Sequence, residues 1–319
     1  MKRTALIVLT WNGLANLQHC LPSVFFQLGA DDQLVVIDNG STDDSLAWVA
    51  THYPAALLIR NETNRGFAAA VNQGIRATDS EFVVTLNDDT LVAPGWLDAL
   101  LEAAQDERMG MCACKMLLAG DPTRFDSAGI EVDRAGIAWN RWFGEPVSAH
   151  PVAAPQEVFG PCGGAALYRR SMLDQVGLFD EDFFAYYEDV DLAWRARHAG
   201  WQCLYAPAAQ VTHAHSATGN RVSGLKRYHL GRNKWWTILK NYPQPQLWLA
   251  LPIILAYDLA AALGGCIHDR RLDALRGRRD AFRQWRRFWM KRTPLLVRVP
   301  LAPLRLLSRI RVGSTDRPI

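Results

Sequence analysis

The sequence predicts an α/β fold: a mostly parallel sheet flanked by helices. Through residues 1–118, short β-branched apolar runs alternate with helical patterns of about 10–15 residues. Parallel strands need crossover connections of this kind, which are right-handed. The chain has 319 residues, of which 49% are hydrophobic and 21% charged. That composition supports about two globular domains and excludes a disordered chain or a small disulfide scaffold.

Residues 1–118 form the first predicted unit. Apolar runs at 4–10, 34–38, 56–59, 82–86 and 109–116 predict strands, and helical patterns lie at about 14–28, 43–53, 66–77 and 95–105. Asp43 and Asp44 mark the start of one helix, and Pro94 marks the start of another.

Residues 119–242 form the second predicted unit. Gly, Pro and aromatic residues dominate up to about 165, with candidate short strands near 129–132 and 136–139. We interpret this part as a loop and hairpin insertion over one edge of the sheet. Helical periodicity returns at 171–176 and 188–198, a strand is predicted at 209–212, and a helix from about 225 ends at 241.

Residues 243–319 form a predicted helical extension that begins with an apolar segment. Residues 247–267 contain no Lys or Arg and are long enough to span a bilayer. However, Asp258 lies in the middle, and Pro252, Gly264 and Gly265 interrupt the segment. A transmembrane helix, a buried core helix and an interfacial or re-entrant segment all remain open.

The end of the chain is strongly basic. From His268 onward there are 15 Lys and Arg against 4 Asp and Glu, whereas the preceding residues are net acidic. A predicted helical face carries Phe282, Trp285, Phe288 and Trp289 among arginines, which suits an anionic membrane surface. The alternative is a basic helix docked on the acidic body. No stacking platform accompanies it, so no nucleic acid partner is expected.

The N-terminal segment predicts a cytoplasmic protein. Only about six apolar residues precede Trp11, which is shorter than the apolar core of a signal peptide. Six Cys are too sparse for a disulfide framework, and Cys112 and Cys114 lie in a predicted apolar strand. These features favour a reducing compartment.

Polar residues follow three predicted strands at their carboxyl ends. The segments are Thr10-Trp11-Asn12-Gly13, Asp38-Asn39-Gly40-Ser41 and Asn87-Asp88-Asp89-Thr90. Ligands of open α/β sheets collect at this edge. A turn and helix cap would explain the second segment alone. The recurrence on three strands favours a pocket for a polar, phosphorylated ligand.

Asp88 and Asp89 suggest a metal. Carboxylates on a short loop suit Mg²⁺ or Mn²⁺ bridging a diphosphate. No Gly-x-Gly-x-x-Gly or Walker sequence is present, so a nicotinamide cofactor and P-loop chemistry lack support.

A second acidic cluster, Glu188-Asp189-Val190-Asp191, opens a predicted helix. The helix dipole alone accounts for acidic residues there. Nearby glycines allow close approach of a ligand, and the preceding aromatic residues would raise a carboxylate pKa toward that of a general base. His213 and His215 follow a predicted strand. Either they contact a metal or a phosphate, or they have a purely structural role.

Taken in order, the motifs of residues 4–242 resemble glycosyltransferase family 2, in particular its rhamnosyltransferase-like branch. They are Thr10-Trp11-Asn12, Asp38-Asn39-Gly40-Ser41-Thr42-Asp43, Asn64-Arg65-Gly66-Phe67-Ala68, Asn72-Gln73-Gly74, Leu86-Asn87-Asp88-Asp89-Thr90, Gly163-Gly164-Ala165, Phe179-Asp180-Glu181-Asp182-Phe183-Phe184, Tyr187-Glu188-Asp189-Val190-Asp191-Leu192 and His213. The resemblance implies a GT-A fold, with a nucleotide-sugar-binding half at 1–118 and an acceptor-binding, catalytic half at 119–242. It also implies inverting transfer from a nucleotide-activated sugar.

The resemblance also implies residue roles. Asn87-Asp88-Asp89 lacks the first Asp of a strict Asp-x-Asp motif, which leaves the number of protein–metal bonds open. The implied roles are nucleoside binding by Thr10, Asn12 and Asp38; nucleotide-site lining by Arg65 and Asn72; metal binding by Asp89 and His213, with Asp88 beside them; general base catalysis by Asp189; and placement of the acceptor by Glu188 and Asp191.

The resemblance favours dTDP-rhamnose as the donor, with UDP- and GDP-sugars open. The catalytic motifs, joined to an apolar segment and a basic aromatic tail, favour a glycan or polyprenol-linked glycan acceptor at the inner face of the cell membrane. A nucleotidyltransferase is the alternative enzyme, but residues 10–14 lack its Gly-rich basic loop. A non-catalytic sugar-binding protein is a further alternative. Retention of both carboxylate clusters argues against it, because unpaired acids in a pocket are costly.

Overall fold

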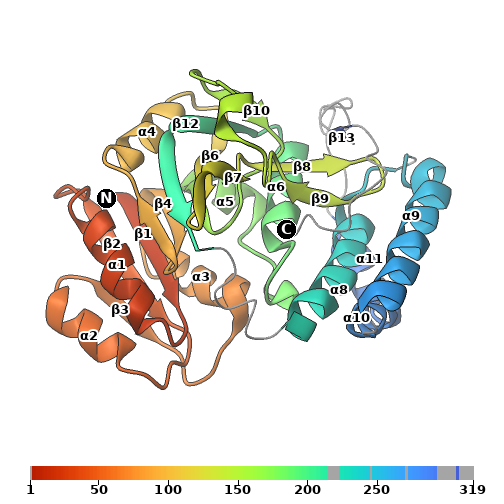
Figure 1. Ribbon diagram of the computed structural model, residues 1–319, viewed down its shortest axis with the longest axis horizontal. Helices are drawn as coiled ribbons and strands as arrows, with labels where there is room; N and C mark the ends of the chain where they lie inside the picture. Colours follow the sequence, from red (N-terminus) through yellow and green to blue (C-terminus); the bar gives the residue numbers. More distant parts are fainter. Residues whose placement is uncertain (1, 215–222, 245, 270–271, 293–306, 309–319) are drawn as a thin grey trace.

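A mixed sheet with helices on both faces forms the centre of the molecule (Figure 1). The computed structural model describes residues 2–214, 223–244, 246–269, 272–292 and 307–308. Within these residues the main sheet has the order β10-β12-β6-β11-β4-β1-β2-β3; β5 also pairs with β12, and β7 with β6. The predicted α/β class is therefore confirmed.

The first half alternates strand and helix as predicted. Strands β1 (Lys2–Thr10), β2 (Asp32–Asp38), β3 (Leu57–Arg60) and β4 (Ser80–Asn87) pair in parallel. Their crossovers are α1 (Leu14–Phe25), α2 (Ser45–His52) and α3 (Gly66–Arg76); β5 (Thr90–Val92), α4 (Trp96–Ala103) and β6 (Met109–Leu118) follow. Within this half the sequence did not predict β5, a three-residue strand.

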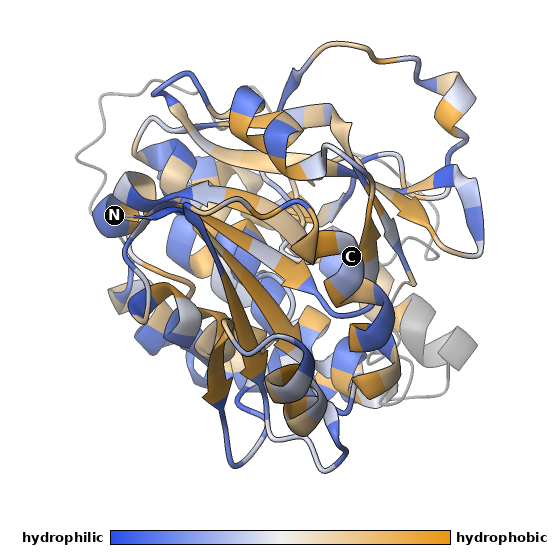
Figure 2. Cartoon of the chain, turned by 90° about the vertical axis from the view of Figure 1, so that its left-hand side faces the viewer, coloured by the Kyte–Doolittle hydropathy of each residue, from blue (hydrophilic) through white to orange (hydrophobic). Residues whose placement is uncertain are grey.

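Successive strand side chains point to opposite faces of the sheet, so each face has its own core. Ile7 and Val35 pack with α3 and with helices of the second half, whereas Leu6 and Val8 pack with α1 and α4. The central strands are apolar on both faces, as Figure 2 shows in orange, because helices cover both sides.

The second half interrupts the parallel order. It contains β7 (Asp121–Ser127), β8 (Ile130–Asp133), β9 (Ala138–Asn140), the short turn η1 (Val147–Ala149), β10 (Gln156–Val158) and β11 (Ala165–Arg169). The predicted hairpin is β8–β9, and it forms a separate small sheet. The sequence analysis did not predict β11, which lies antiparallel between β4 and β6. It was missed because its pairing partners are distant in the sequence, so that no local pattern marks it.

The remaining elements of this half lie where predicted, with one longer than expected. They are α5 (Arg170–Val176), α6 (Glu188–His198), β12 (Gln202–His213) and α8 (Ser223–Asn241); the short turn η2 (Glu181–Phe183) was not predicted. Strand β12 runs well beyond the predicted 209–212 because it pairs with β6 along most of its length, with a register shift between Ala206 and Gln210.

Helices α9 (Gln246–Asp269), α10 (Asp273–Arg283) and α11 (Trp285–Met290) lie beside α8 at one end of the molecule (Figure 1), and β13 (Leu307–Ser308) pairs with β8. The single aromatic face predicted for residues 282–289 is wrong. The helix breaks at Gln284, so Phe282 and Trp285 remain exposed while Phe288 is buried against Trp236.

Candidate active site

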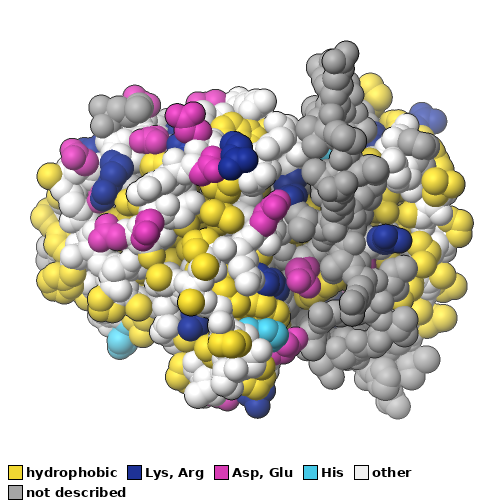
Figure 3. Space-filling model, turned by 90° about the horizontal axis from the view of Figure 1, so that it is seen from above, with side chains coloured by type: hydrophobic (Ala, Val, Ile, Leu, Met, Phe, Trp, Pro, Cys, Tyr) yellow, Lys and Arg dark blue, Asp and Glu magenta, His cyan; other side chains and the backbone are white. Residues whose placement is uncertain are grey.

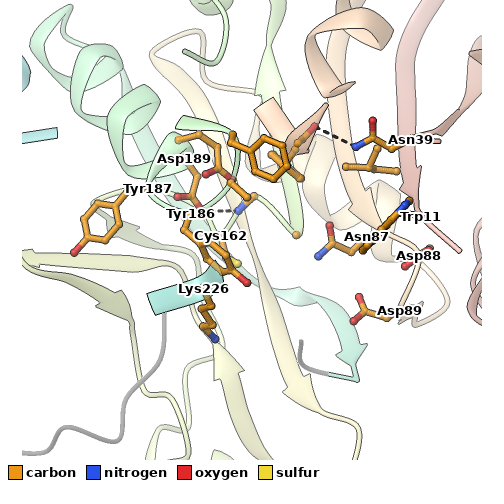
Figure 4. A pocket seen from close by; sticks show the side chains of 18 of the residues that line it. Trp11, Asn39, Asn87, Asp88, Asp89, Cys162, Tyr186, Tyr187, Asp189 and Lys226 are labelled. Carbon is orange, nitrogen blue, oxygen red and sulfur yellow. Dashed lines mark hydrogen bonds between the residues drawn. The ribbon is translucent and has the colours of Figure 1, made fainter. Parts of the chain in front are cut away.

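A cavity of about 480 Å³ lies beyond the carboxyl ends of β1, β2 and β4 (Figure 4). Both acidic clusters predicted from the sequence contribute to its wall. Asp88 and Asp89 come from the strand-end loop, and Glu188 and Asp189 come from the start of α6. The predicted half at 1–118 and the predicted half at 119–242 therefore meet in one cavity. Its other polar lining side chains include Thr10, Asn39, Asn87, Asp126, His213 and Lys226.

The strand-end side of the cavity is held by short contacts across the sheet edge. Thr10 Oγ1 donates to Asp88 Oδ2 at 2.6 Å, and Asn16 Nδ2 lies 3.4 Å from Asp88 Oδ1. A Cβ on Gly13 would overlap the Asp88 carboxylate, so the β1–α1 turn can pass this close only with glycine. These contacts orient Asp88 at the cavity wall.

His213 lies between two carboxylates at the end of β12. Its Nε2 is 3.1 Å from Asp89 Oδ1, and its Nδ1 is 2.6 Å from Asp126 Oδ2. Burial lowers the pKa of His213, but hydrogen bonds to Asp126 and Asp89 outweigh burial and raise it to about 10. The sequence analysis predicted Asp89 and His213 together and missed Asp126, which lies on the unpredicted strand β7.

Two of these side chains, Asp89 and His213, carry donor atoms that suit a divalent cation. Carboxylate oxygen and imidazole nitrogen are ligands that Mn²⁺ accepts, and a metal-bound histidine commonly gives its other ring nitrogen to a carboxylate. Asp89 and Asp126 face opposite nitrogens of the ring, so they do not converge on one point. Accordingly, no three acidic, His or Cys side chains within the described residues are arranged around a common metal position.

Asp189 and Glu188 occupy the opposite side of the cavity. Asp189 Oδ2 accepts a hydrogen bond from Gly163 N at 3.0 Å, and Oδ1 accepts one from Val190 N at 2.8 Å. Burial raises the pKa of Asp189 and these bonds oppose the rise. Burial and the Asp189 charge raise the pKa of Glu188 well above its usual value. Asp189 is thus the member of the pair better stabilised as a carboxylate.

A strained segment precedes these two residues. Phe184, Tyr186 and Tyr187 all have φ between 66° and 70°, a region that side chains other than glycine rarely occupy. Asn233 of α8 holds the segment: its Nδ2 lies 2.9, 2.9 and 2.7 Å from the carbonyl oxygens of residues 183, 185 and 186. Asn233 is fully buried. The sequence analysis missed it because a single Asn within a helical pattern carries no signal.

The structure places Asp191 outside the cavity. Its carboxylate contacts Arg195 Nε at 2.9 Å, Lys240 Nζ at 3.0 Å and Asn241 Nδ2 at 2.8 Å. Burial alone would raise the pKa of Asp191, but the two cations outweigh it and lower the pKa to about 2. Asp191 therefore joins α6 to α8, and its predicted contact with an acceptor has no geometric support.

Four residues predicted to bind the nucleotide also lie outside the cavity lining: Asn12, Asp38, Arg65 and Asn72. Asn12 Oδ1 accepts from Thr42 N at 2.7 Å, and Asp38 Oδ1 accepts from Ser41 N at 2.9 Å. Both side chains shape turns beside the cavity.

Asn72 exchanges hydrogen bonds with the backbone of Phe179 at 2.8 and 3.1 Å, and Arg65 is exposed. Asn39 contributes to the lining from the same sheet edge; its Oδ1 accepts from Arg65 N at 3.0 Å. Nucleotide binding by Asn12, Asp38, Arg65 and Asn72 stays a prediction.

Comparison with known proteins decides the family. The model of the family described as "Glycosyl transferase family 2" matches residues 5–177, more than half of the chain. The chain belongs to glycosyl transferase family 2. It is therefore a glycosyltransferase, and the carboxylate-lined cavity is its candidate active site.

Among curated relatives, the chain is similar to N-acetylglucosaminyl-diphospho-decaprenol L-rhamnosyltransferase of Mycobacterium tuberculosis. The two are 30% identical over 249 residues, which cover 70% of this chain and 80% of the relative. The chain also resembles the pre-mycofactocin glycosyltransferase of the same organism, at 30% identity over 57% of this chain and 37% of that one.

Solved structures show the same GT-A fold. A mannosyltransferase from Pyrobaculum calidifontis in complex with GDP-Man and Mn²⁺ superposes with a TM-score of 0.56 at 21% identity, covering 91% of this chain and 83% of that one. TarS 1–349 of S. aureus gives a TM-score of 0.58 at 17% identity, covering 90% and 80%. At these identities the likeness concerns the fold alone.

Proposed function

We propose that this glycosyltransferase moves a sugar from a nucleoside diphosphate to an acceptor hydroxyl with inversion, the donor being dTDP-L-rhamnose and the acceptor a glycan carried on a polyprenol. The observation that carries the proposal is that Asp89 and Asp189 line the same cavity, so that one donor sugar lies between them. The similarity to a rhamnosyltransferase over most of both chains supports the choice of sugar.

Asp189 acts as the general base. Its raised pKa makes it a stronger base than an exposed carboxylate, and its two backbone hydrogen bonds orient it toward the cavity. Asp189 takes the proton of the acceptor hydroxyl as the oxygen attacks the anomeric carbon. The bond from that carbon to the diphosphate oxygen breaks in the same displacement, through an oxocarbenium-like transition state, so the configuration inverts.

The leaving diphosphate needs positive charge. Asp89 and His213 are the residues that would hold Mg²⁺ or Mn²⁺, which when bound neutralises charge developing on the diphosphate. Lys226 of α8 also lines the cavity and brings a side-chain ammonium to it. Asp88 is oriented by Thr10 beside this group.

The proposed location is the cytoplasmic face of the cell membrane, with the protein bound peripherally. A polyprenol-linked acceptor is itself held in the bilayer, so the enzyme must work at its surface. The basic, partly apolar C-terminal helices support this location.

Product analysis tests the proposal. The purified protein is incubated with dTDP-rhamnose, UDP- and GDP-sugars, each with Mg²⁺, Mn²⁺ or EDTA, and released nucleotide is measured. We expect dTDP release that requires a divalent cation and rises with a polyprenol-diphosphate glycan acceptor. Release of pyrophosphate instead would identify a nucleotidyltransferase, and activity with another donor alone would reject rhamnose.

A further inference from the structure

Helix α9 presents an apolar face that other described elements leave uncovered. Trp248, Leu249, Leu255, Leu259 and Leu263 recur along it at helical spacing and are 46–80% exposed. Figure 3 shows hydrophobic side chains with basic ones among them at the right-hand end, the end where Figure 1 places α9. Only 22% of the segment Gln246–Leu263 is buried, so α9 is not a core helix. Apolar patches of this kind mark membrane or protein contacts.

The opposite face of α9 is fixed to the protein by Asp258. This buried carboxylate is hydrogen-bonded to Lys234 Nζ, to Trp235 Nε1 at 2.9 Å and to Arg278 Nε at 2.9 Å. Breaking such a network leaves an unpaired charge in the interior, which is strongly unfavourable. The middle of α9 is therefore attached to both α8 and α10.

Helix α10 cannot enter a bilayer with α9. It crosses α8 in close backbone contact, since a Cβ on Gly231 would lie 2.5 Å from Ala274 O. It also carries exposed arginines at 276, 279 and 283. Because Arg278 meets Asp258 at the middle of α9, a spanning α9 would carry these charges to the bilayer centre. Arginine is among the residues least tolerated there.

The surroundings of the apolar face identify what covers it. Exposed apolar side chains at Leu275 and Phe282 of α10 and at Trp285 of α11 alternate in sequence with the arginines of these helices. Apolar groups enter the headgroup region of a bilayer, while arginines bind anionic headgroups. We propose that α9 lies in the plane of an anionic membrane surface without spanning it, and that α10 supplies the flanking positive charge.

This placement rests on the peripheral membrane location in the proposed function and is tested without donor or acceptor. The full chain is floated with vesicles of phosphatidylcholine alone or with 30% phosphatidylglycerol (on the order of a bacterial anionic fraction). We expect binding to the anionic vesicles and at least roughly tenfold weaker binding to the neutral ones. Equal binding to both, or binding to neither, overturns the proposal. Nucleotide release from the donor is measured separately. It distinguishes a protein without the proposed enzyme activity from one that does not bind the membrane through α9.

Two double variants distinguish specific membrane binding through α9 and α10 from non-specific binding of the protein to vesicles. Leu255→Glu with Leu259→Glu, and Arg276→Glu with Arg283→Glu, should each weaken binding to anionic vesicles by roughly tenfold or more and leave donor hydrolysis unchanged. Matched controls are Phe26→Glu, since Phe26 is 87% exposed beside α1, and Arg108→Glu, whose side chain is 71% exposed. Loss of binding in the controls, or full binding in both double variants, contradicts the proposal.

Extraction of membranes distinguishes lying on the bilayer from spanning it. Membranes from cells expressing the full chain are washed with carbonate at alkaline pH, which releases peripheral proteins and leaves spanning helices in the pellet. We expect the chain in the supernatant. Its retention in the pellet, beside a known spanning protein, would reject the in-plane placement of α9.

Discussion

The two sides of the cavity are built differently. On the Asp88–Asp89 side, functional side chains follow regular parallel strands, and backbone register brings them together: Thr10 pairs with Asp38, and Leu9 with Asn87. On the Asp189 side, the backbone is strained, and side chains from a helix distant in sequence hold it, chiefly Asn233 and Lys240. One side is positioned by sheet geometry and the other by buried polar contacts, so the two should respond differently to substitution.

The largest effect on activity is expected at Asp189, the proposed general base. Asp189→Asn keeps the shape of the side chain and removes its ability to take a proton, so kcat should fall by roughly 10²–10⁴-fold. Donor affinity, measured by calorimetry with the nucleotide-sugar, should stay near that of the parent. A variant with full kcat would remove Asp189 from this role.

The largest effect on stability is expected at Asp191. Replacing it with Asn removes the carboxylate that pairs with Arg195 and leaves Lys240 with Asp180 alone, which should cost about 3–5 kcal/mol in the free energy of unfolding. Since the folded pKa of Asp191 is lowered to about 2, its stabilisation is present above the unfolded value and is lost as the pH falls toward 2.

Urea unfolding of the parent and of Asp191→Asn at a series of pH values measures this contribution. The difference between the two proteins should shrink as the pH falls from about 5 toward 2. A difference that stays constant over that range would mean that Asp191 charge does not stabilise the fold.

A smaller effect, again on the base side, is expected at Asn233. Asn233→Ala removes the amide that donates to the carbonyls of residues 185 and 186 and shares the carbonyl of Phe183 with Arg232, so it should lower kcat by roughly 10- to 100-fold, with a loss of about 1–3 kcal/mol in stability. Because Asn233 does not line the cavity, donor KM should change little. Reduced stability with an unchanged kcat would show that the segment keeps its conformation without Asn233.

The smallest effect is expected on the strand-end side, at Asp126. Asp126→Asn weakens the contact that orients His213, so affinity for Mn²⁺ should fall by roughly 10- to 100-fold while the protein stays folded. Electron paramagnetic resonance of free Mn²⁺ measures the affinity without turnover. Asp121→Asn, whose side chain is 47% exposed on the same strand, is the matched control. Equal affinity in both variants would rule out this role for Asp126.

The same contrast explains which parts of the fold and of the candidate site could be predicted from the sequence alone. The regular half was predicted nearly element by element because apolar periodicity and strand-end polar residues are local signals. Strand β11 and Asp126 were missed because they depend on pairing between distant segments. The motif order predicted that Asp89, His213, Glu188 and Asp189 belong to one site, and all four line the cavity; their roles stay predictions.

Asn12, Asp38, Arg65, Asn72 and Asp191 show the limit of that reasoning. Their motifs are in place, yet their side chains lie outside the cavity lining: in turns, on the surface, in an ion pair or, for Asn72, buried against the backbone of Phe179. A motif identifies a neighbourhood in the fold, but which of its side chains reaches the cavity depends on turn geometry and on partners such as Lys240 that no local pattern reveals.

Asn233 and Lys234 are consecutive residues of α8, and they contact opposite partners: the segment before the base and the carboxylate that anchors α9. Because adjacent residues make the two contacts, with a rise of about 1.5 Å between them, α8 joins the segment before Asp189 directly to the helix that we propose lies on the membrane. For an acceptor tethered to that membrane, this short connection would fix the height above the lipid at which its hydroxyl must reach Asp189.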